Sequence, residues 1–398
     1  MKKKRIFIAI HYLEIGGAEI SLVGLLNAID YSRYEVDLFV YSHQGELMKL
    51  IPKEVNLLPE ISKYAQIERP MTSVLKRGYV DIVLARLWVK IRFASYARRV
   101  KPKDGSAVFQ YVANAVTPCL PSLHHLGMYD LAISFLTPHN IVLKKVQARK
   151  KIAWIHTDYS RIDVNATLEL PVWSGYDYIA SISPGVSRTF LSVFPSLKGK
   201  LVEIANILSP TFVRSRANEK EDLSVFGNKA IKLLSVGRFS HPKNFDNVPD
   251  ILRRIRDKGI DARWYLIGYG GEEPLIRQRI REAGMENLVV IIGKKANPYP
   301  YIRACDLYVQ PSRYEGNSVT VREAQMLCKP VVVTDYPTAA SQIQNGKDGI
   351  IVPLENTACA EGIARVIQDT QLQSSLIQFL KAHDYGNENE VEKIYKLI

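Results

Sequence analysis

The amino-acid sequence predicts an α/β protein made of two parallel-sheet domains, and three observations support that class. Short apolar runs alternate with stretches of helical apolar spacing along most of the chain. This alternation breaks once, near Ser209-Pro210, and then starts again. The 398 residues, 47% of them hydrophobic, are enough to give two domains a core each. Strands and helices in alternation form parallel sheets with right-handed crossovers.

The first half opens with a βαβ unit. Lys4–Ile10 is an apolar run typical of a buried strand, Ala18–Ala28 has helical spacing, and Glu35–Tyr41 alternates as a strand. Later strands of this half are expected at Leu131–Leu136, Lys151–His156, Tyr178–Ser183 and Leu201–Ile207. We expect the N-terminal domain to cover residues 1–208.

The second half repeats the alternation more regularly. The polar stretch Ser215–Asn228 is typical of a linker between domains. Apolar positions at helical spacing predict a terminal helix in Glu390–Ile398. We expect a second domain at residues 209–385 and the terminal helix within 386–398. Six strands are expected in this domain: Lys232–Gly237, Ala262–Gly268, Val289–Gly293, Asp306–Gln310, Pro330–Thr334 and Gly349–Val352.

Composition favours a cytoplasmic chain. No apolar run reaches the roughly eighteen residues that span a bilayer. The basic start, Met1–Arg5, is followed only by Ile6–Ile10, which is too short for the apolar part of a signal peptide. The four cysteines are scattered and none forms Cys-x-x-Cys, so reduced thiols are expected rather than a disulfide framework or a structural zinc site.

The net charge of +13 is concentrated in the first half of the chain, which favours an anionic partner there. The segment Ser73–Lys103 carries nine cations and a single acid, Asp81, with Trp88 and Phe93 among them. Cations mixed with bulky apolar groups suit a helix in the headgroup region of an anionic membrane. A solvated basic face is the alternative. Nucleic acid is the competing anion, but no recognition motif accompanies the segment, so we expect none to bind.

Two charge motifs follow predicted strands of the second half. The first places Arg238 and Lys243 five residues apart after a strand, and the second separates Glu315 from Glu323 by seven residues. Ligands of doubly wound sheets bind outside the carboxyl ends of the strands, so both motifs should open onto one crevice. Two cations neutralise a diphosphate, and two carboxylates accept hydrogen bonds from sugar and ribose hydroxyls. The combination predicts a nucleotide-sugar site.

Each motif also has a purely structural interpretation. Arg238 and Lys243 are common types of solvated loop charge. Thr320 and Glu323 have the Ser/Thr-x-x-Glu spacing of a helix capping box, which would occupy the Glu323 carboxylate. His156 ends a predicted strand, where a histidine is often structural.

The Arg-x4-Lys and Glu-x7-Glu motifs, in this order and strand context, resemble the donor site of retaining glycosyltransferases of family 4. The sequence Ile15-Gly16-Gly17-Ala18-Glu19 after the first strand is similar to the glycine-rich loop of that family. The resemblance covers nearly the whole chain and is strongest over residues 231–353. It implies the GT-B fold, in which two Rossmann-like domains face each other across a cleft, and a terminal helix that returns to the first domain.

The resemblance also implies roles for individual residues. Arg238 and Lys243 hold the donor diphosphate, Glu315 contacts the transferred sugar, and Glu323 binds ribose. These cations and helix-terminal amides replace a metal ion, so no cofactor is expected. The remaining candidates are His156 as a catalytic residue facing the cleft, and Gly16, Gly17, Gly293, Gly316, Asn317, Ser318 and Val319 in donor binding. Where the family often has a bulkier or apolar residue, this chain has Asn317-Ser318. The difference affects the expected sugar specificity more than donor binding.

The sequence therefore predicts a hexosyltransferase that uses a nucleotide-diphosphate sugar, most simply a UDP-sugar, without a metal. Its acceptor is expected to be a lipid-linked or glycan molecule of cell-surface polysaccharide synthesis, at the anionic inner leaflet of the membrane. Two alternatives stay open. One is a GT-B nucleotide-sugar epimerase, which releases sugar without an acceptor. The other is a non-catalytic membrane or nucleic-acid binding protein.

Overall fold

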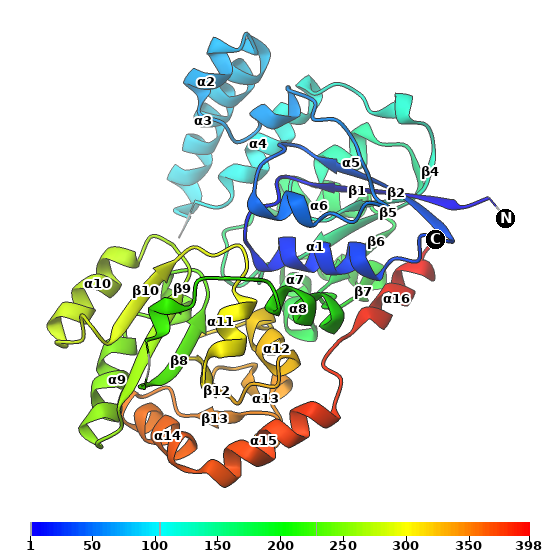
Figure 1. Cartoon of the computed structure of the whole chain (residues 1–398). Helices are drawn as coiled ribbons and strands as arrows, with labels where there is room; N and C mark the ends of the chain where they lie inside the picture. The colour runs from blue at the N-terminus through cyan, green and yellow to red at the C-terminus, as the bar shows by residue number, and fades with distance from the viewer. Residues whose placement is uncertain (1, 103–104, 228) are drawn as a thin grey trace. The chain divides into compact units, whose positions relative to one another are not determined.

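The computed structural model describes residues 2–102, 105–227 and 229–398, which form two compact α/β units (Figure 1). Unit 1 contains the chain up to Ile207 together with Glu388–Ile398. Unit 2 contains Leu208–Asn387, so it is inserted between two segments of unit 1. The expected α/β class with two parallel sheets is confirmed.

The linker expected at Ser215–Asn228 is wrong for its described part, 215–227, which belongs to unit 2; Asn228 lies outside the described residues. This stretch overlaps helix α8 (Pro210–Ala217), whose first turn is capped by the Ser209 hydroxyl, and α8 packs against α11 (Tyr299–Ala304). Most polar residues of this stretch are exposed, but some of them also make structural contacts. Arg216 is buried and donates to Glu219 at 2.8 Å.

The sheet of unit 1 has seven parallel strands in the order β3-β2-β1-β4-β5-β6-β7. Every strand expected in this half is present, although β7 ends four residues early, and the two-residue β3 was not predicted because it is too short to show a pattern. The strands are β1 (Lys4–Ile10), β2 (Tyr34–Val40), β3 (Asn56–Leu57), β4 (Tyr129–Ser134), β5 (Ala148–Ile155), β6 (Tyr178–Ser181) and β7 (Leu201–Glu203). Its helices are α1 (Gly17–Ala28), α2 (Met71–Lys76), α3 (Val80–Val100), α4 (Val108–Val116), α5 (Asn140–Lys145), α6 (Ala166–Ser174), α7 (Pro184–Val193) and α16 (Val391–Tyr395).

The C-terminal helix α16 packs on unit 1 beside the start of β2. The ring of Tyr395 stacks on Tyr34 with ring centroids 4.3 Å apart, and its hydroxyl accepts a hydrogen bond from the Asp30 amide at 2.8 Å. Just before the helix, Glu390 accepts from the amide of Ala205 at 2.9 Å. A stacked aromatic pair contributes about 1 kcal/mol beyond its burial, so these contacts hold the end of the chain in place.

The sheet of unit 2 has six parallel strands in the order β10-β9-β8-β11-β12-β13, all at expected positions. Parallel strands are covered on both faces, which is why they appeared in the sequence as continuous apolar runs. The strands are β8 (Ile231–Val236), β9 (Ala262–Ile267), β10 (Val289–Gly293), β11 (Leu307–Gln310), β12 (Val331–Thr334) and β13 (Ile350–Val352). The other helices are α9 (Val248–Asp257), α10 (Glu273–Glu282), α12 (Val319–Met326), α13 (Ala339–Gln342), α14 (Asn356–Gln368) and α15 (Thr370–Ala382).

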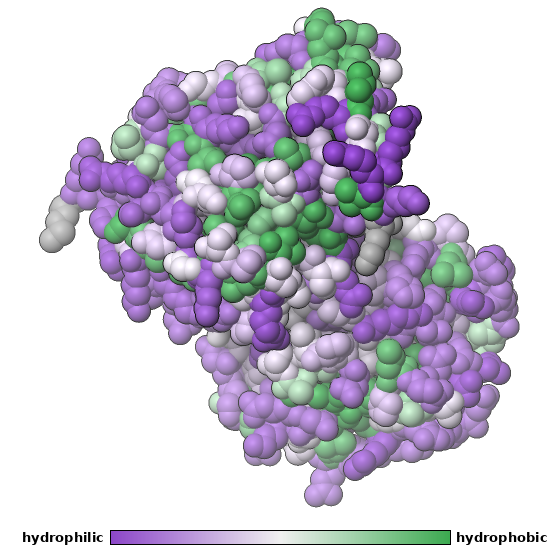
Figure 2. Space-filling model, turned by 180° about the vertical axis from the view of Figure 1, so that it is seen from behind, coloured by the Kyte–Doolittle hydropathy of each residue, from purple (hydrophilic) through white to green (hydrophobic). Residues whose placement is uncertain are grey.

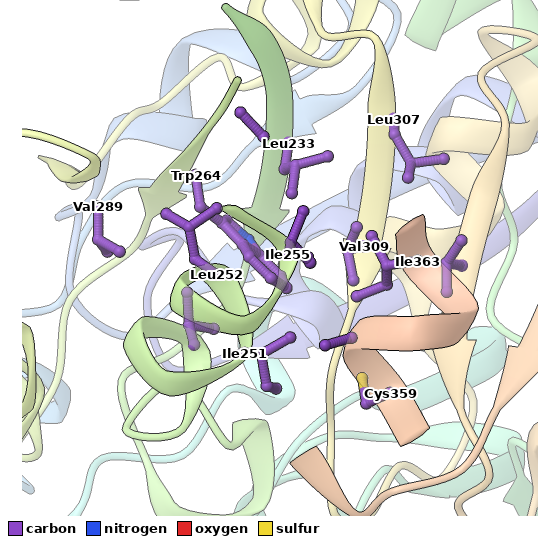
Figure 3. Close-up of a cluster of buried hydrophobic side chains, with 14 of the residues drawn as sticks. Leu233, Ile251, Leu252, Ile255, Trp264, Val289, Leu307, Val309, Cys359 and Ile363 are labelled. Carbon is purple, nitrogen blue, oxygen red and sulfur yellow. The ribbon is translucent and has the colours of Figure 1, made fainter. Parts of the chain in front are cut away.

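One face of this sheet carries the main core of unit 2, where α9 and α14 cover the strands (Figure 3). Ile255 and Ile363, from these two helices, are completely buried. Trp264 of β9 lies among them, and its indole N–H is satisfied by the Ser235 hydroxyl at 2.9 Å. Ser235 in turn donates to the carbonyl of Val309 at 2.6 Å. The core thus fixes the central strands β8, β9 and β11, whose carboxyl ends carry the charge motifs.

None of the helices in the described part of the chain is long and apolar enough to cross a membrane.

Candidate functional site

The two charge motifs of unit 2 meet at the carboxyl ends of the neighbouring strands β8 and β11. Lys243 follows β8 and Glu315 follows β11, and the Lys243 Nζ lies 2.6 Å from the Glu315 Oε1. Both side chains are largely buried, so this ion pair is held in a defined geometry. The expectation that the two motifs share one site is therefore met for this pair.

The loop after β8 is shaped to present Lys243. A short 3-10 turn (His241–Lys243) is followed by Asn244 in the left-handed conformation, with φ of 61°. Asn244 is buried and donates to the carbonyl of Pro311 at 2.8 Å. A side chain at Gly237 would lie 3.3 Å from the Lys243 stem, so the glycine gives that stem room to lie against the backbone.

The loops after β8 and β11 are also tied to each other. Arg313 makes a bidentate pair with Asp246, with distances of 2.8 and 2.7 Å. The amide of Arg313 donates to the carbonyl of Pro242 at 2.8 Å. Bidentate pairs fix orientation as well as distance. The relative positions of Lys243 and Glu315 are thus set by contacts next to them.

One oxygen of the Glu315 carboxylate accepts three hydrogen bonds, and the other accepts none from the described residues. The Oε1 atom accepts from the Ser312 hydroxyl at 2.6 Å and from Gln310 at 3.1 Å, in addition to Lys243. No described residue donates to Oε2. A fixed carboxylate with one open oxygen is suited to accept a hydrogen bond from a ligand hydroxyl.

Arg238 is the exposed cation of the site. Its backbone is held in place, because the next amide, of Phe239, donates to Tyr269 at 2.8 Å. The guanidinium itself forms no ion pair with any described residue, so it is available to an anion. The first motif therefore offers one cation paired with a carboxylate and one unpaired cation.

Helix α12 begins where the second motif predicted a helix start, but its cap differs from the expected capping box. Ser318 is the N-cap residue and its side chain makes no capping hydrogen bond, while Thr320 lies inside the helix. A side chain at Gly316 would meet open space, and Asn317 is exposed. Amides at such a helix start, including that of Val319, favour an anion.

The capping-box alternative for Glu323 is wrong. Its carboxylate is buried and accepts from the Tyr299 hydroxyl at 2.7 Å. Burial raises the pKa of Glu323 to about 7, because the ionised form loses its hydration, and the Tyr299 hydrogen bond opposes only part of that rise. Near neutral pH this carboxyl therefore exists in both protonation states.

Sequence analysis missed a glycine-rich loop after β9. A side chain at Gly268 would lie 1.8 Å from the carbonyl oxygen of Gly237, and one at Gly270 would lie 2.3 Å from that of Phe239. Only glycine fits where this loop packs against the Arg238 loop. The amide of Gly268 also donates to the carbonyl of Gly293, which ends β10 with φ of 85°. The sequence Gly268-Tyr269-Gly270-Gly271 after a strand was the available indication.

The candidates of unit 1 lie at the carboxyl ends of its strands. Gly16 is the N-cap residue of α1 and Gly17 is its first residue. The carboxylate of Glu19 folds back over Gly16, where a side chain would lie 2.2 Å from it. Gly16 itself has extended backbone, with φ of −160°, and the close neighbour is the end of a flexible side chain.

His156 directly follows β5 and is held by aromatic neighbours. Its ring lies 4.7 Å from that of Phe135 and nearly parallel to that of Trp154. Burial lowers the pKa of His156 to about 3, so the imidazole is neutral at physiological pH. It can take part in hydrogen bonding but does not supply a positive charge.

Part of unit 2 is similar to a known protein family. Residues 216–383, less than half of the chain, match the family model described as "Glycosyl transferases group 1". The amylovoran biosynthesis glycosyltransferase AmsD of Erwinia amylovora is 26% identical over 209 residues, which are 52% of this chain and 58% of AmsD. The N-acetylgalactosamine-N,N'-diacetylbacillosaminyl-diphospho-undecaprenol 4-alpha-N-acetylgalactosaminyltransferase of Campylobacter jejuni is 25% identical over 195 residues, 46% of this chain and 52% of that protein. The chain thus spans little more than half the length of these relatives.

Solved structures resemble the chain over nearly its full length. HepE of Anabaena, crystallised with UDP and glucose, has a TM-score of 0.67 at 16% identity, with 98% of each chain covered. TarM of S. aureus, crystallised with UDP among its ligands, has a TM-score of 0.68 at 13% identity, with 99% of each chain covered. Likeness at this level of identity shows the fold. The chain has the GT-B fold, built here from two Rossmann-like α/β units.

Proposed function

We propose that this chain is a retaining glycosyltransferase of family 4 that moves a hexose from a UDP-sugar to a lipid-linked or glycan acceptor in cell-surface polysaccharide synthesis. The observation that carries the proposal is the contact between Lys243 and Glu315, which brings the two motifs together. A nucleotide sugar has a diphosphate and a polyol on either side of one bond. A cation beside a carboxylate matches these two groups.

The nature of donor and acceptor is supported by relatives. HepE is also known in complex with UDP-glucose, and TarM in complex with UDP. The name of the Campylobacter jejuni relative specifies a diphospho-undecaprenol acceptor, and AmsD acts in amylovoran biosynthesis. A UDP-sugar and a lipid-linked acceptor are the simplest choices consistent with these proteins.

In the proposed reaction the site stabilises the leaving diphosphate. The acceptor hydroxyl oxygen bonds to the anomeric carbon while the bond from that carbon to the diphosphate oxygen breaks. Attack and departure take place on the same face of the sugar, and the hydroxyl proton passes to the departing phosphate. Negative charge then accumulates near Lys243, Arg238 and the amides just before and at the start of α12, those of Gly316, Asn317 and Val319, while the Ser318 amide donates to the Gln342 side chain at 3.0 Å. Charges fixed before the reaction stabilise such a state without reorganisation.

The two glutamates have separate roles in this proposal. Glu315 uses its open Oε2 to accept a hydroxyl of the transferred sugar, and it also holds Lys243 in position. Glu323 accepts the ribose hydroxyls, for which Tyr299 leaves it unused acceptor capacity. His156 is proposed to be a catalytic residue that acts as a neutral imidazole. Because the cations and amides act on the diphosphate, we propose that transfer needs no metal and proceeds undiminished in EDTA.

Helix α3 supports membrane contact. Leu84, Leu87, Trp88 and Ile91 are spaced to form one stripe, and their exposed fractions are 61%, 43%, 51% and 72%. Figure 2 shows apolar and hydrophilic groups side by side at the upper right, where α2 and α3 lie. Exposed cations near the stripe, none ion-paired with a described residue, are Lys76, Arg77, Lys90, Arg92, Arg98, Arg99 and Lys101; Lys103 lies outside the described residues.

An apolar stripe flanked by cations suits a helix lying in the interface of an anionic bilayer. We propose that α3 docks the enzyme on the cytoplasmic leaflet, close to a lipid-linked acceptor. Nucleic acid is not proposed as a partner, because the apolar stripe offers it nothing to bind.

The decisive experiment combines donor binding with transfer. UDP-, GDP- and ADP-sugars are screened by thermal shift, since a bound ligand raises the apparent stability. We expect UDP-sugars to give the largest shift, and the best donor to label a lipid extract with retained anomeric configuration. Release of free sugar without acceptor would indicate the epimerase. Binding of UDP with no turnover on any extract would indicate a non-catalytic protein.

A further inference from the structure

Unit 1 contains a pocket of about 760 Å³ beneath α3, with α4, α6 and the end of β5 as its other walls. Helix α4 packs against both α3 and α6, so the three helices are joined through α4 (Figure 1). This volume is within the usual range of ligand sites, roughly 300 to 1,000 Å³. Its apolar lining includes Val89, Phe109, Val112, Leu136, Leu168 and Trp173.

Several polar groups of the lining are already occupied by one another. Glu169 accepts from the Tyr159 hydroxyl at 3.2 Å and from the Trp173 indole at 3.1 Å, and burial raises its pKa. Asn140 donates to Asn114 at 2.7 Å. A sugar needs many unpaired donors and acceptors around it. Where the polar groups of the lining are paired with one another and the remaining surface is largely apolar, the pocket suits a hydrocarbon chain better.

The end of the pocket at β5 is different, because it contains an unsatisfied donor. The indole Nε1 of Trp154 has no hydrogen-bond partner among the described residues, although this side chain is only 1% exposed. A buried donor without a partner is costly, and an oxygen of a ligand would satisfy it. The neutral ring of His156 and the exposed Thr157 lie at the same end. The pocket therefore has a polar end at β5 and an apolar end under α3 and α4.

The apolar end continues to the surface of the protein. Phe109 lines the pocket and is also 65% exposed, so it forms part of the rim. Val89 of α3 lines the pocket, whereas Leu84 and Ile91 lie on the outer face of the same helix. Arg86 lines the pocket near Glu68, whose negative charge offsets that of the guanidinium. Lys90 also lines the rim, and it forms no ion pair with a described residue. A chain leaving the pocket thus reaches the apolar stripe of α3.

We propose that this pocket binds the lipid part of the acceptor: an oxygen of its phosphate end accepts from Trp154, and the adjoining hydrocarbon lies between α3 and α4. This inference rests on the proposed function and specifies the acceptor as a long-chain lipid phosphate. In this proposal α3 has two roles: its outer face contacts the membrane, and its inner face contacts the hydrocarbon chain of the lipid.

The test measures binding of soluble prenyl phosphates to the full chain by calorimetry, below their aggregation concentrations. Farnesyl phosphate is compared with dimethylallyl phosphate, inorganic phosphate and glucose. We expect farnesyl phosphate to bind at least tenfold more tightly than dimethylallyl phosphate, with a negative heat-capacity change that reports apolar burial. Equal affinity for the two prenyl phosphates, or tighter binding of glucose, would overturn the proposal.

Two variants locate the binding. Val112→Phe fills the pocket and should weaken binding of farnesyl phosphate at least tenfold, whereas Leu354→Phe, at an exposed leucine of unit 2, is the matched control and should leave that affinity unchanged. Trp154→Phe should weaken both prenyl phosphates several-fold and preserve their ratio, which keeps the proposal testable if Val112→Phe fails to fold. Unchanged affinity in Val112→Phe and Trp154→Phe overturns it. UDP binding by the same samples separates failure of this pocket from failure of the donor site.

Discussion

Unit 1 and unit 2 have the same kind of parallel sheet, yet the sites at the carboxyl ends of their strands differ in chemistry. In unit 2 the site is made of charges fixed by other charges, as Lys243 is by Glu315 and Arg313 by Asp246. In unit 1 the corresponding region is a largely apolar pocket, and among its described lining residues Trp154 and His156 have ring nitrogens without a hydrogen-bond partner. The fold supplies the position of a site, and the loops decide whether it suits an anion or a hydrocarbon.

The difference also concerns rigidity and exposure. The loops of unit 2 are joined by hydrogen bonds on both sides of Lys243, so its charge is in place before a ligand arrives. Helix α3, which covers the pocket in unit 1, has an outer face that is apolar and exposed. Pre-placed charges suit the stabilisation of a transition state, whereas an exposed apolar helix suits contact with a membrane. The comparison can be tested separately on each side.

The largest effect is expected from Lys243→Ala. Loss of one charge contact to a leaving diphosphate typically costs about 3 kcal/mol, or about a hundredfold in rate. We expect kcat to fall by that amount with little change in the KM for the donor, measured with one active donor and acceptor pair. Glu315→Gln keeps the shape and should lower transfer while UDP affinity stays nearly intact. Near-full turnover by both variants in folded protein would show that the proposed mechanism is wrong.

Glu323→Gln tests the buried carboxyl of unit 2 through the pH dependence of stability. The pKa of Glu323 is raised from 4.5 to about 7 in the folded protein, so the folded state binds a proton that the unfolded state has lost. The free energy of unfolding of the wild type should therefore fall as pH rises from about 4.5 to 7, relative to the variant, by up to roughly 3 kcal/mol.

Urea unfolding at a series of pH values measures this difference. The surface variant Glu286→Gln is the control and should show no such trend. A stability difference between Glu323→Gln and wild type that does not depend on pH would contradict the raised pKa. The KM for the donor should also rise in the variant if Glu323 binds ribose, with kcat less affected.

A smaller effect is expected at the proposed membrane face of unit 1. Each Lys or Arg near an anionic bilayer contributes about 1 kcal/mol, so Lys90→Gln with Arg92→Gln should weaken binding to phosphatidylglycerol vesicles by about 2 kcal/mol. Sedimentation with vesicles measures this, and added salt should reduce binding of the wild type. Lys258→Gln with Arg365→Gln, in unit 2, is the matched charge control. Equal binding to neutral and anionic vesicles would count against docking by α3.

The smallest effect is expected from Tyr395→Phe. The variant keeps the stacking on Tyr34 but loses the hydroxyl that accepts from the Asp30 amide. One hydrogen bond contributes about 1 kcal/mol, and the unpaired amide adds to the loss. Thermal unfolding should show a small decrease in midpoint without loss of UDP binding. An equal decrease in the UDP-binding affinity would mean that the two units do not behave independently.

The strands were predictable because each parallel strand is an apolar run buried on both faces, as Val331–Thr334 shows. Local patterns failed where a distant residue decides the outcome. Thr320 and Glu323 match a capping box, but the hydroxyl of Tyr299, 24 residues away, donates a hydrogen bond to the Glu323 carboxylate. The stretch after Ala217 looked like a linker because its charges are frequent, yet those charges make contacts inside unit 2.

The candidate donor-site residues could be named from motifs because their spacing is local, and the structure adds which of them touch. Lys243 and Glu315 meet, whereas Arg238 stays free and the roles of Gly16 and His156 stay predictions. The glycine-rich loop at Gly268 was not predicted as part of the site, because it contains no charged residue. The pocket of unit 1 could not be predicted, since its walls come from segments far apart in the chain.

The insertion of unit 2 into unit 1 has a consequence for biosynthesis. On the ribosome, all of unit 2 emerges before Glu388–Ile398 becomes available to the strand that begins at Tyr34. Domains fold as they are completed, so unit 2 can reach its structure while unit 1 still exposes the surface that Tyr395 covers. The contact between Asp30 and Tyr395 spans 365 residues of sequence, and it forms only after translation has reached the far end of the inserted unit. Helix α16 thus completes unit 1 only after the whole of unit 2 has been synthesised.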